Sequence, residues 1–73
     1  MITDDINNKI EILKNIKKIQ SESDKFEFDT LLSNYQLLQT QIDMKLTKNN
    51  DELKNILDIL EEKHQYFRSK YLN

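Results

Sequence analysis

A single histidine, His64, is the one side chain of this sequence whose ordinary pKa allows proton exchange close to neutral pH. Glu61 and Glu62 lie beside it and could add carboxylate oxygens to a metal site. The chain has no cysteine and no second histidine, so the usual ligands of a structural zinc ion are missing. We therefore expect no metal and no cofactor, and we interpret His64 as a core or core-boundary histidine.

The hydroxyl groups do not indicate catalysis either. A nucleophilic serine needs an adjacent base that is held by a third group, and no such pattern surrounds Ser21, Ser23, Ser33 or Ser69. A pair of carboxylates could still act as general acid and base. However, 73 residues without a glycine leave little room for a substrate pocket. We predict that the protein is not an enzyme.

Composition narrows the class of partner. The chain has 11 basic and 13 acidic residues, which gives a net charge of −2. Binding to DNA or RNA requires a dense basic surface, so we expect no nucleic-acid partner. The sequence also lacks the run of about 20 apolar residues that spans a membrane, and its acidic start does not resemble a signal peptide. We expect a cytoplasmic protein without a membrane span.

The residue types favour an all-α fold in a single domain over residues 1–73. Glycine, proline and valine are absent, so tight hairpin turns and strand-forming residues are scarce. Polar interruptions at 21–24 and 47–50 separate three apolar runs. We predict helices at about 4–20, 25–46 and 51–71. Their expected N-caps are Thr3, Asp24 with Glu27 in a capping box, and Asn49 with Glu52.

The second and third runs predict an antiparallel, coiled-coil-like hairpin. The third has apolar or aromatic residues at spacings of 4-3-4-3-4, namely Leu53, Leu57, Leu60, His64, Phe67 and Tyr71. A turn at residues 49–50 pairs them with a matching row on the second helix, with Tyr35 opposite His64 and Phe28 opposite Tyr71. The first helix then lies along this hairpin in an up-down-up arrangement, or else forms a mobile arm.

Some apolar residues are left over. Phe26, Leu37 and Met44 recur at intervals of 11 and 7 residues, almost opposite the centre of the hairpin row. Either the first helix wraps further around, or another chain covers this second face. A smaller row on the third helix, Ile56, Ile59 and Tyr66, could receive the first helix. The first run is itself apolar over half its circumference. The predicted partner-binding residues are Phe26, Leu37, Met44, Ile12, Ile16 and Ile19.

These surplus apolar faces favour a non-enzymatic helical protein–protein interaction module. A domain this small retains only about 3–5 kcal/mol of stability from its own core, so a partner would help to stabilise it. We expect a different protein as the partner, with a homodimer as the other possibility. The alternative functions are a self-assembling subunit of a helical bundle and a small regulator that blocks a transcription or signalling protein.

The stretch Asp24-Lys25-Phe26-Glu27-Phe28 resembles the start of the second helix in the small co-chaperones of type III secretion systems. The helix that it opens continues with Leu31, Leu32, Leu37 and Leu38. The resemblance covers about half of the chain and rests on architecture rather than on a diagnostic motif. It implies a short cytoplasmic protein whose C-terminal hairpin stabilises a larger tetratricopeptide-like chaperone of the needle subunit. The predicted third helix is long and aromatic for that family.

Overall fold

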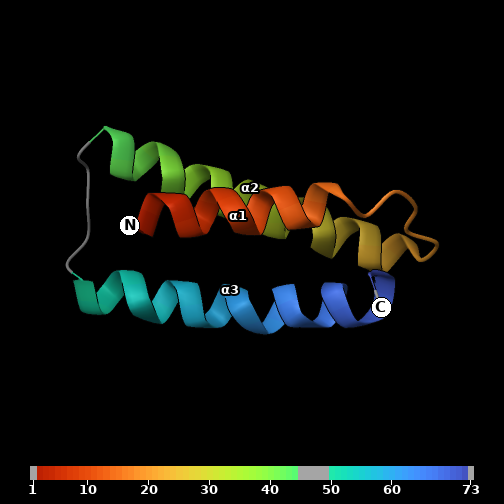
Figure 1. Cartoon of the computed structure of the whole chain (residues 1–73). Coiled ribbons are helices and arrows are strands. Elements are labelled where there is room, and N and C mark those ends of the chain that lie inside the picture. Colours follow the sequence, from red (N-terminus) through yellow and green to blue (C-terminus); the bar gives the residue numbers. More distant parts are fainter. Residues whose placement is uncertain (1, 45–49, 73) are drawn as a thin grey trace.

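The computed structural model describes residues 2–44 and 50–72, and three α-helices contain most of them (Figure 1). Helix α1 comprises Ile2–Lys14, α2 comprises Glu22–Asp43 and α3 comprises Asn50–Tyr71. Within the described residues there is no β-strand. The predicted all-α fold is confirmed.

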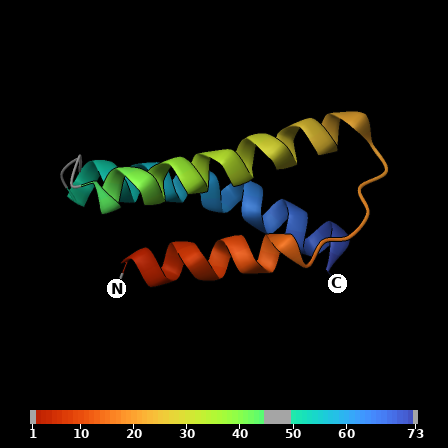
Figure 2. The same cartoon turned by 90° about the horizontal axis from the view of Figure 1, so that it is seen from above.

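The helices alternate in direction along an elongated molecule of 37 × 19 × 18 Å. Helix α1 runs from the N-terminal end to the opposite end, α2 returns, and α3 repeats the direction of α1 (Figure 1). Seen from above, α1 and α2 lie on either side of the molecule and α3 passes behind the space between them (Figure 2). The arrangement is therefore up-down-up, with α1 packed along the hairpin.

The first helix is shorter than predicted, because it ends at Lys14 and not near residue 20. The backbone N–H of Asn15 donates to the carbonyl of Ile12 at 3.1 Å, and that of Ile16 donates to Leu13 at 3.0 Å. Such three-residue bonds tighten the last turn of a helix. Residues 16–21 are not helical. They carry the chain across to α2, and a helix reaching residue 20 would leave too little chain for that crossing.

The second helix begins earlier than predicted. Ser21 is its N-cap, with an extended backbone (φ −89°, ψ 134°) and a hydroxyl that accepts from the backbone N–H of Asp24 at 3.4 Å. The predicted capping box of Asp24 with Glu27 is therefore wrong, since both residues lie inside α2. Thr3 likewise lies inside α1 and is not its cap. The expected cap at Asn49 and the expected helical residues 45 and 46 fall outside the described residues.

All three helices contribute to one core. Its buried hydrophobic residues are Ile6, Ile10 and Leu13 of α1, Leu31, Tyr35 and Leu38 of α2, and Leu53, Leu60 and Phe67 of α3. The expected pairing of Tyr35 with His64 is confirmed by an edge-to-face ring contact with centroids 6.1 Å apart. Phe28, however, meets Phe67 at 5.7 Å, one helical turn before the expected Tyr71. The hydroxyl of Tyr71 bonds Asp24 instead.

Leu31 tests how far this core determines stability, because only 2% of its surface is exposed. We expect Leu31→Ala to lower the free energy of unfolding by about 2–5 kcal/mol, which approaches the whole stability of a domain of this size. Urea unfolding followed by circular dichroism measures the change. The matched control is Leu72→Ala, at an exposed position, with an expected loss below about 1 kcal/mol. Equal losses in the two variants would contradict the core assignment.

Candidate protein–protein interface

One flank of α2 exposes apolar residues that the core does not cover. Phe26 is 73% exposed, Leu37 57% and Met44 63%. At 100° per residue they share an arc of about 100° with the four uncharged polar residues that fall there between positions 26 and 44. We call this arc the neutral face, made up of Phe26, Thr30, Ser33, Asn34, Leu37, Gln41 and Met44. No charged residue of α2 falls within it, although 33% of the chain is charged.

The neutral face borders a groove between α2 and α3. One part of this groove, about 290 Å³, is lined by Phe26 and Thr30 of α2 and by Ile59 of α3. The next part, about 330 Å³, is lined by Leu37 and Gln41 and again by Ile59. Both parts share Asn34, Ile59 and Leu60, so the two hollows adjoin and form one groove, the α2–α3 groove. Ile59 is 66% exposed here and Tyr66 of the same row is also exposed, whereas Ile56 packs partly buried against the core.

The charged residues that line the α2–α3 groove bond to each other. The ammonium of Lys63 donates to a carboxylate oxygen of Glu27 at 3.1 Å. The remaining lining residues are apolar or uncharged. A partner can therefore cover the groove without taking an unpaired charge out of water, which is the costly step in burying polar surface.

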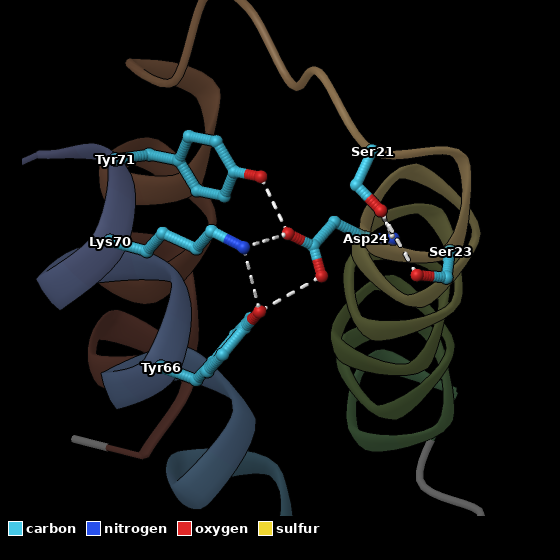
Figure 3. Close-up of polar contacts among 6 residues, drawn as sticks. All are labelled: Ser21, Ser23, Asp24, Tyr66, Lys70 and Tyr71. Atoms are coloured by element: carbon cyan, nitrogen blue, oxygen red, sulfur yellow. Dashed lines mark hydrogen bonds and ion pairs between the residues drawn. The ribbon is translucent and has the colours of Figure 1, made fainter.

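At one end of the hairpin, Asp24 ties α2 to α3 (Figure 3). It lies in the first turn of α2 and is only 5% exposed. One carboxylate oxygen accepts from the hydroxyl of Tyr66 at 3.0 Å. The other accepts from the ammonium of Lys70 at 2.8 Å and from the hydroxyl of Tyr71 at 2.6 Å. The last turns of α3 are thereby fixed beside the start of α2.

The hydrogen bonds from Lys70 and Tyr71 hold the pKa of Asp24 down at about 2, although burial of the carboxylate works against them. In return, the bond from Asp24 raises the pKa of Lys70. Both groups are therefore charged at neutral pH, and the contact between them is a charge-assisted hydrogen bond. Sequence reasoning missed this cluster because it assigned Asp24 to a cap. The sequence does contain a sign of the cluster. In an antiparallel hairpin, the polar groups of Tyr66, Lys70 and Tyr71 on the third helix lie beside Asp24 on the second.

Polar contacts also attach α1 to the hairpin. Lys9 forms an ion pair with Glu61, and Gln39 donates to Asn7. The Nε2 of fully buried His64 lies 3.3 Å from the carbonyl oxygen of Lys9. His64 Nδ1 and the Tyr35 hydroxyl are buried and have no hydrogen-bond partner among the described residues. The predicted core position of His64 is thus confirmed, but only one of its two ring nitrogens is satisfied.

The structure places the six predicted partner-binding residues in three parts of the molecule. Phe26, Leu37 and Met44 belong to the neutral face. Ile12 lines a different groove, about 440 Å³, between α1 and α3. Ile16 packs against the core from the connecting segment, and Ile19 is half-buried in that segment. The binding role of all six stays a prediction, and the exposed surface that could serve it lies on α2.

Within residues 2–44 and 50–72, no group of three or more acidic or histidine side chains is placed to hold a metal ion. Over the same residues, no helix combines the length and apolarity that crossing a bilayer requires. Comparison of the chain with protein-family models, with curated proteins and with solved structures found no match in any of the three.

Replacing Asp24 with asparagine tests the polar cluster. The amide keeps the shape of the side chain but loses the charge that Lys70 and Tyr71 bond. We expect faster amide hydrogen exchange, by several-fold, over the last turn of α3 at neutral pH, while exchange at its centre stays slow. Asp29→Asn removes a carboxylate from an exposed position of the same helix and should leave exchange unchanged. Similar exchange in the two variants would show that Asp24 does not hold the end of α3.

The burial of His64 predicts a pH dependence of stability. Burial lowers the pKa of His64 below its ordinary 6.5, so the unfolded chain binds a proton more readily than the folded one. The contribution to stability is complete above pH 6.5 and is lost as the pH falls below it. We expect the free energy of unfolding to fall between pH 7 and pH 5, well above the range in which Asp24 titrates.

An NMR titration of the His64 ring measures this directly in the unmodified protein. A native pKa at or above 6.5 would contradict the prediction. The variant His64→Asn should show a flatter dependence of unfolding free energy on pH over the same range.

Proposed function

We propose that this protein is a non-enzymatic protein–protein interaction module that binds a helix of another protein through the neutral face and the α2–α3 groove. The observation that carries the proposal is the row of exposed Phe26, Leu37 and Met44 on a flank without charged residues. Contiguous exposed apolar surface of this kind is typical of association sites. Depletion of charge at the centre is a feature of protein interfaces.

The proposed mode of binding is a helix laid into a groove. Helix α1 packs along one side of the α2–α3 hairpin, and the α2–α3 groove opens away from it. A further helix in that groove would give a four-helix packing around α2 and α3. It would present apolar side chains at intervals of three and four residues, as amphipathic helices do when they bind in grooves.

The available apolar surface is sufficient for a stable complex. Burying three side chains such as Phe26, Leu37 and Met44 contributes roughly 4–8 kcal/mol before the costs of association are subtracted. Ile59 on the other wall of the groove adds to this surface. Because such a small domain has little stability of its own, a bound partner would also shift its folding equilibrium towards the native state.

The finer role that we propose is that of a small cytoplasmic adaptor or co-chaperone that stabilises its partner. This role is supported by the exposed apolar face and by the resemblance of residues 24–28 to the start of the second helix of type III secretion co-chaperones. Phe26, within that stretch, is the most exposed large hydrophobic residue among those described.

Charge placed on the neutral face tests the proposal. We expect Leu37→Glu to keep the fold, because Leu37 is 57% exposed, but to lose the partner, because the new carboxylate would be buried without a counter-charge. The matched control is Gln36→Glu, which adds the same charge to the adjacent exposed position outside the neutral face. Circular dichroism verifies that both variants are folded.

The measurement is co-purification of the tagged chain from cells that express it naturally, followed by reconstitution of the complex from purified components. A protein that binds the natural chain and the Gln36→Glu variant, but not the Leu37→Glu variant, supports the proposal. A partner bound equally by all three chains would place the interface elsewhere on the molecule.

A further inference from the structure

The groove of about 440 Å³ between α1 and α3, which we call the α1–α3 groove, is lined by residues of all three helices. It shares none of its lining residues with the neutral face or the α2–α3 groove. We propose that the α1–α3 groove binds a small uncharged molecule with an apolar body and one hydroxyl group, which bonds the hydroxyl of Tyr35. This site goes beyond the proposed protein–protein interface and can be tested separately from it.

The hydroxyl of Tyr35 is a buried polar group that the protein leaves unbonded. Only 1% of Tyr35 is exposed, and its hydroxyl has no hydrogen-bond partner among the described residues. Burying such a group without a partner costs free energy. Tyr35 belongs to α2, whereas the other residues that line the α1–α3 groove belong to α1 or α3. The far end of the ring, which carries the hydroxyl, is therefore the part of Tyr35 that reaches the groove.

This hydroxyl is available as a hydrogen-bond donor. Burial, and after it the charge of Glu61, raise the pKa of Tyr35 above its ordinary value. Tyr35 thus keeps its proton at neutral pH, and the influence of Glu61 indicates that the carboxylate lies near the hydroxyl. Glu61 also lines the groove. A ligand hydroxyl, which both donates and accepts, can therefore accept from Tyr35 and donate to Glu61.

The other walls of the groove suit an apolar body. Ile6 and Ile12 of α1 and Leu57 of α3 line it. Ligand sites of about 300–1,000 Å³ typically combine mostly apolar walls with a few polar groups that orient the ligand. The volume and the lining of the α1–α3 groove both fit this description.

The charges at the groove favour an uncharged ligand. Lys9 and Glu61 form an ion pair with each other, so neither needs a counter-charge from a ligand. Asp5 lines the groove at an exposed position, where water and salt screen its charge. A cation therefore gains little, and an anion is repelled by both Asp5 and Glu61.

The same ion pair controls access to Tyr35. The side chains of Lys9 and Glu61 are 29% and 33% exposed and join α1 to α3. Ion pairs that water reaches contribute little to stability. These two long side chains can therefore move apart and admit a ligand to the buried hydroxyl at little cost.

Phenol tests the site, because it combines an apolar ring with one hydroxyl. We expect a dissociation constant of about 1 mM, as suits so small a molecule, and a shift of the NMR signals of the His64 ring, which contacts Tyr35. Nuclear Overhauser effects between phenol and the methyl groups of Ile6, Ile12 and Leu57 would locate it. Toluene, which lacks the hydroxyl, and benzoate, which is charged, should each bind about 5-fold more weakly or worse.

Replacing Tyr35 with phenylalanine removes the hydroxyl and keeps the ring in the core. We expect Tyr35→Phe to raise the dissociation constant for phenol by about 5- to 10-fold, which corresponds to one hydrogen bond. The matched control is Tyr66→Phe, because the Tyr66 hydroxyl bonds Asp24 and Tyr66 does not line the groove. That variant should bind phenol as the natural chain does. Circular dichroism verifies that both variants are folded.

The outcomes separate this inference from the proposed function. Equal affinity of phenol for the natural chain and Tyr35→Phe overturns the inference, as do Overhauser contacts to Leu37 and Ile59 in place of those to Ile6, Ile12 and Leu57. If Tyr35→Phe does not fold, the Overhauser contacts in the natural chain decide alone. Leu37→Glu lies outside the α1–α3 groove, so it should lose the protein partner and still bind phenol.

Discussion

The geometry of three packed helices is the constraint on which the rest of this structure depends. Helix α2 has neighbours on one side only, since α1 and α3 both pack against the half that carries Leu31, Tyr35 and Leu38. Within residues 2–44 and 50–72, no fourth helix covers the other half. That half has exposed charged residues at Glu22, Lys25, Asp29 and Asp43, but its neutral face has only uncharged polar and large apolar side chains. The composition of the neutral face suits an interface that excludes water better than a surface exposed to solvent.

A buried charge cluster determines where the exposed surface lies. Burying Asp24 and part of Lys70 costs desolvation energy, and such pairs often contribute little net stability. What the cluster provides is position, because a carboxylate with three donors fits only one register of α2 against α3. The ion pair of Lys63 with Glu27 is a second polar contact between α3 and α2, about one turn of α2 from Asp24. Together these contacts set the width of the α2–α3 groove and the place of Ile59 along it.

Periodicity predicted the elements, and particular side chains decided their ends. The 4-3 spacing of the third run was sufficient to predict α3, the antiparallel hairpin and the meeting of Tyr35 with His64. The exposure of Phe26, Leu37 and Met44 followed from the same wheel arithmetic. The end of α1 could not be predicted in this way, because the apolar pattern continues through Ile16 and Ile19 although the chain leaves the helix. The cap of α2 was missed because the side chains of Ser21 and Asp24 both suit an N-cap. Only the position of Tyr71 shows that Asp24 bonds α3, which leaves Ser21 as the cap.

The contacts that α1 makes with the hairpin differ in kind from those between α2 and α3. The buried hydroxyl of Tyr35 and the Nδ1 of His64 have no hydrogen-bond partner in the part of the chain that the structure describes, and such groups cost free energy that a bonded pair would not. The carboxylate of Glu61 lies 3.9 Å from His64 Nδ1, which is beyond hydrogen-bond distance. Helix α1 is also the shortest helix and is joined to α2 by non-helical chain. The α2–α3 contact, by contrast, contains the edge-on rings of Phe28 and Phe67 and the Asp24 cluster. The Asp24 cluster therefore fixes how α2 and α3 lie against each other, whereas α1 supplies the buried apolar side chains of Ile6, Ile10 and Leu13.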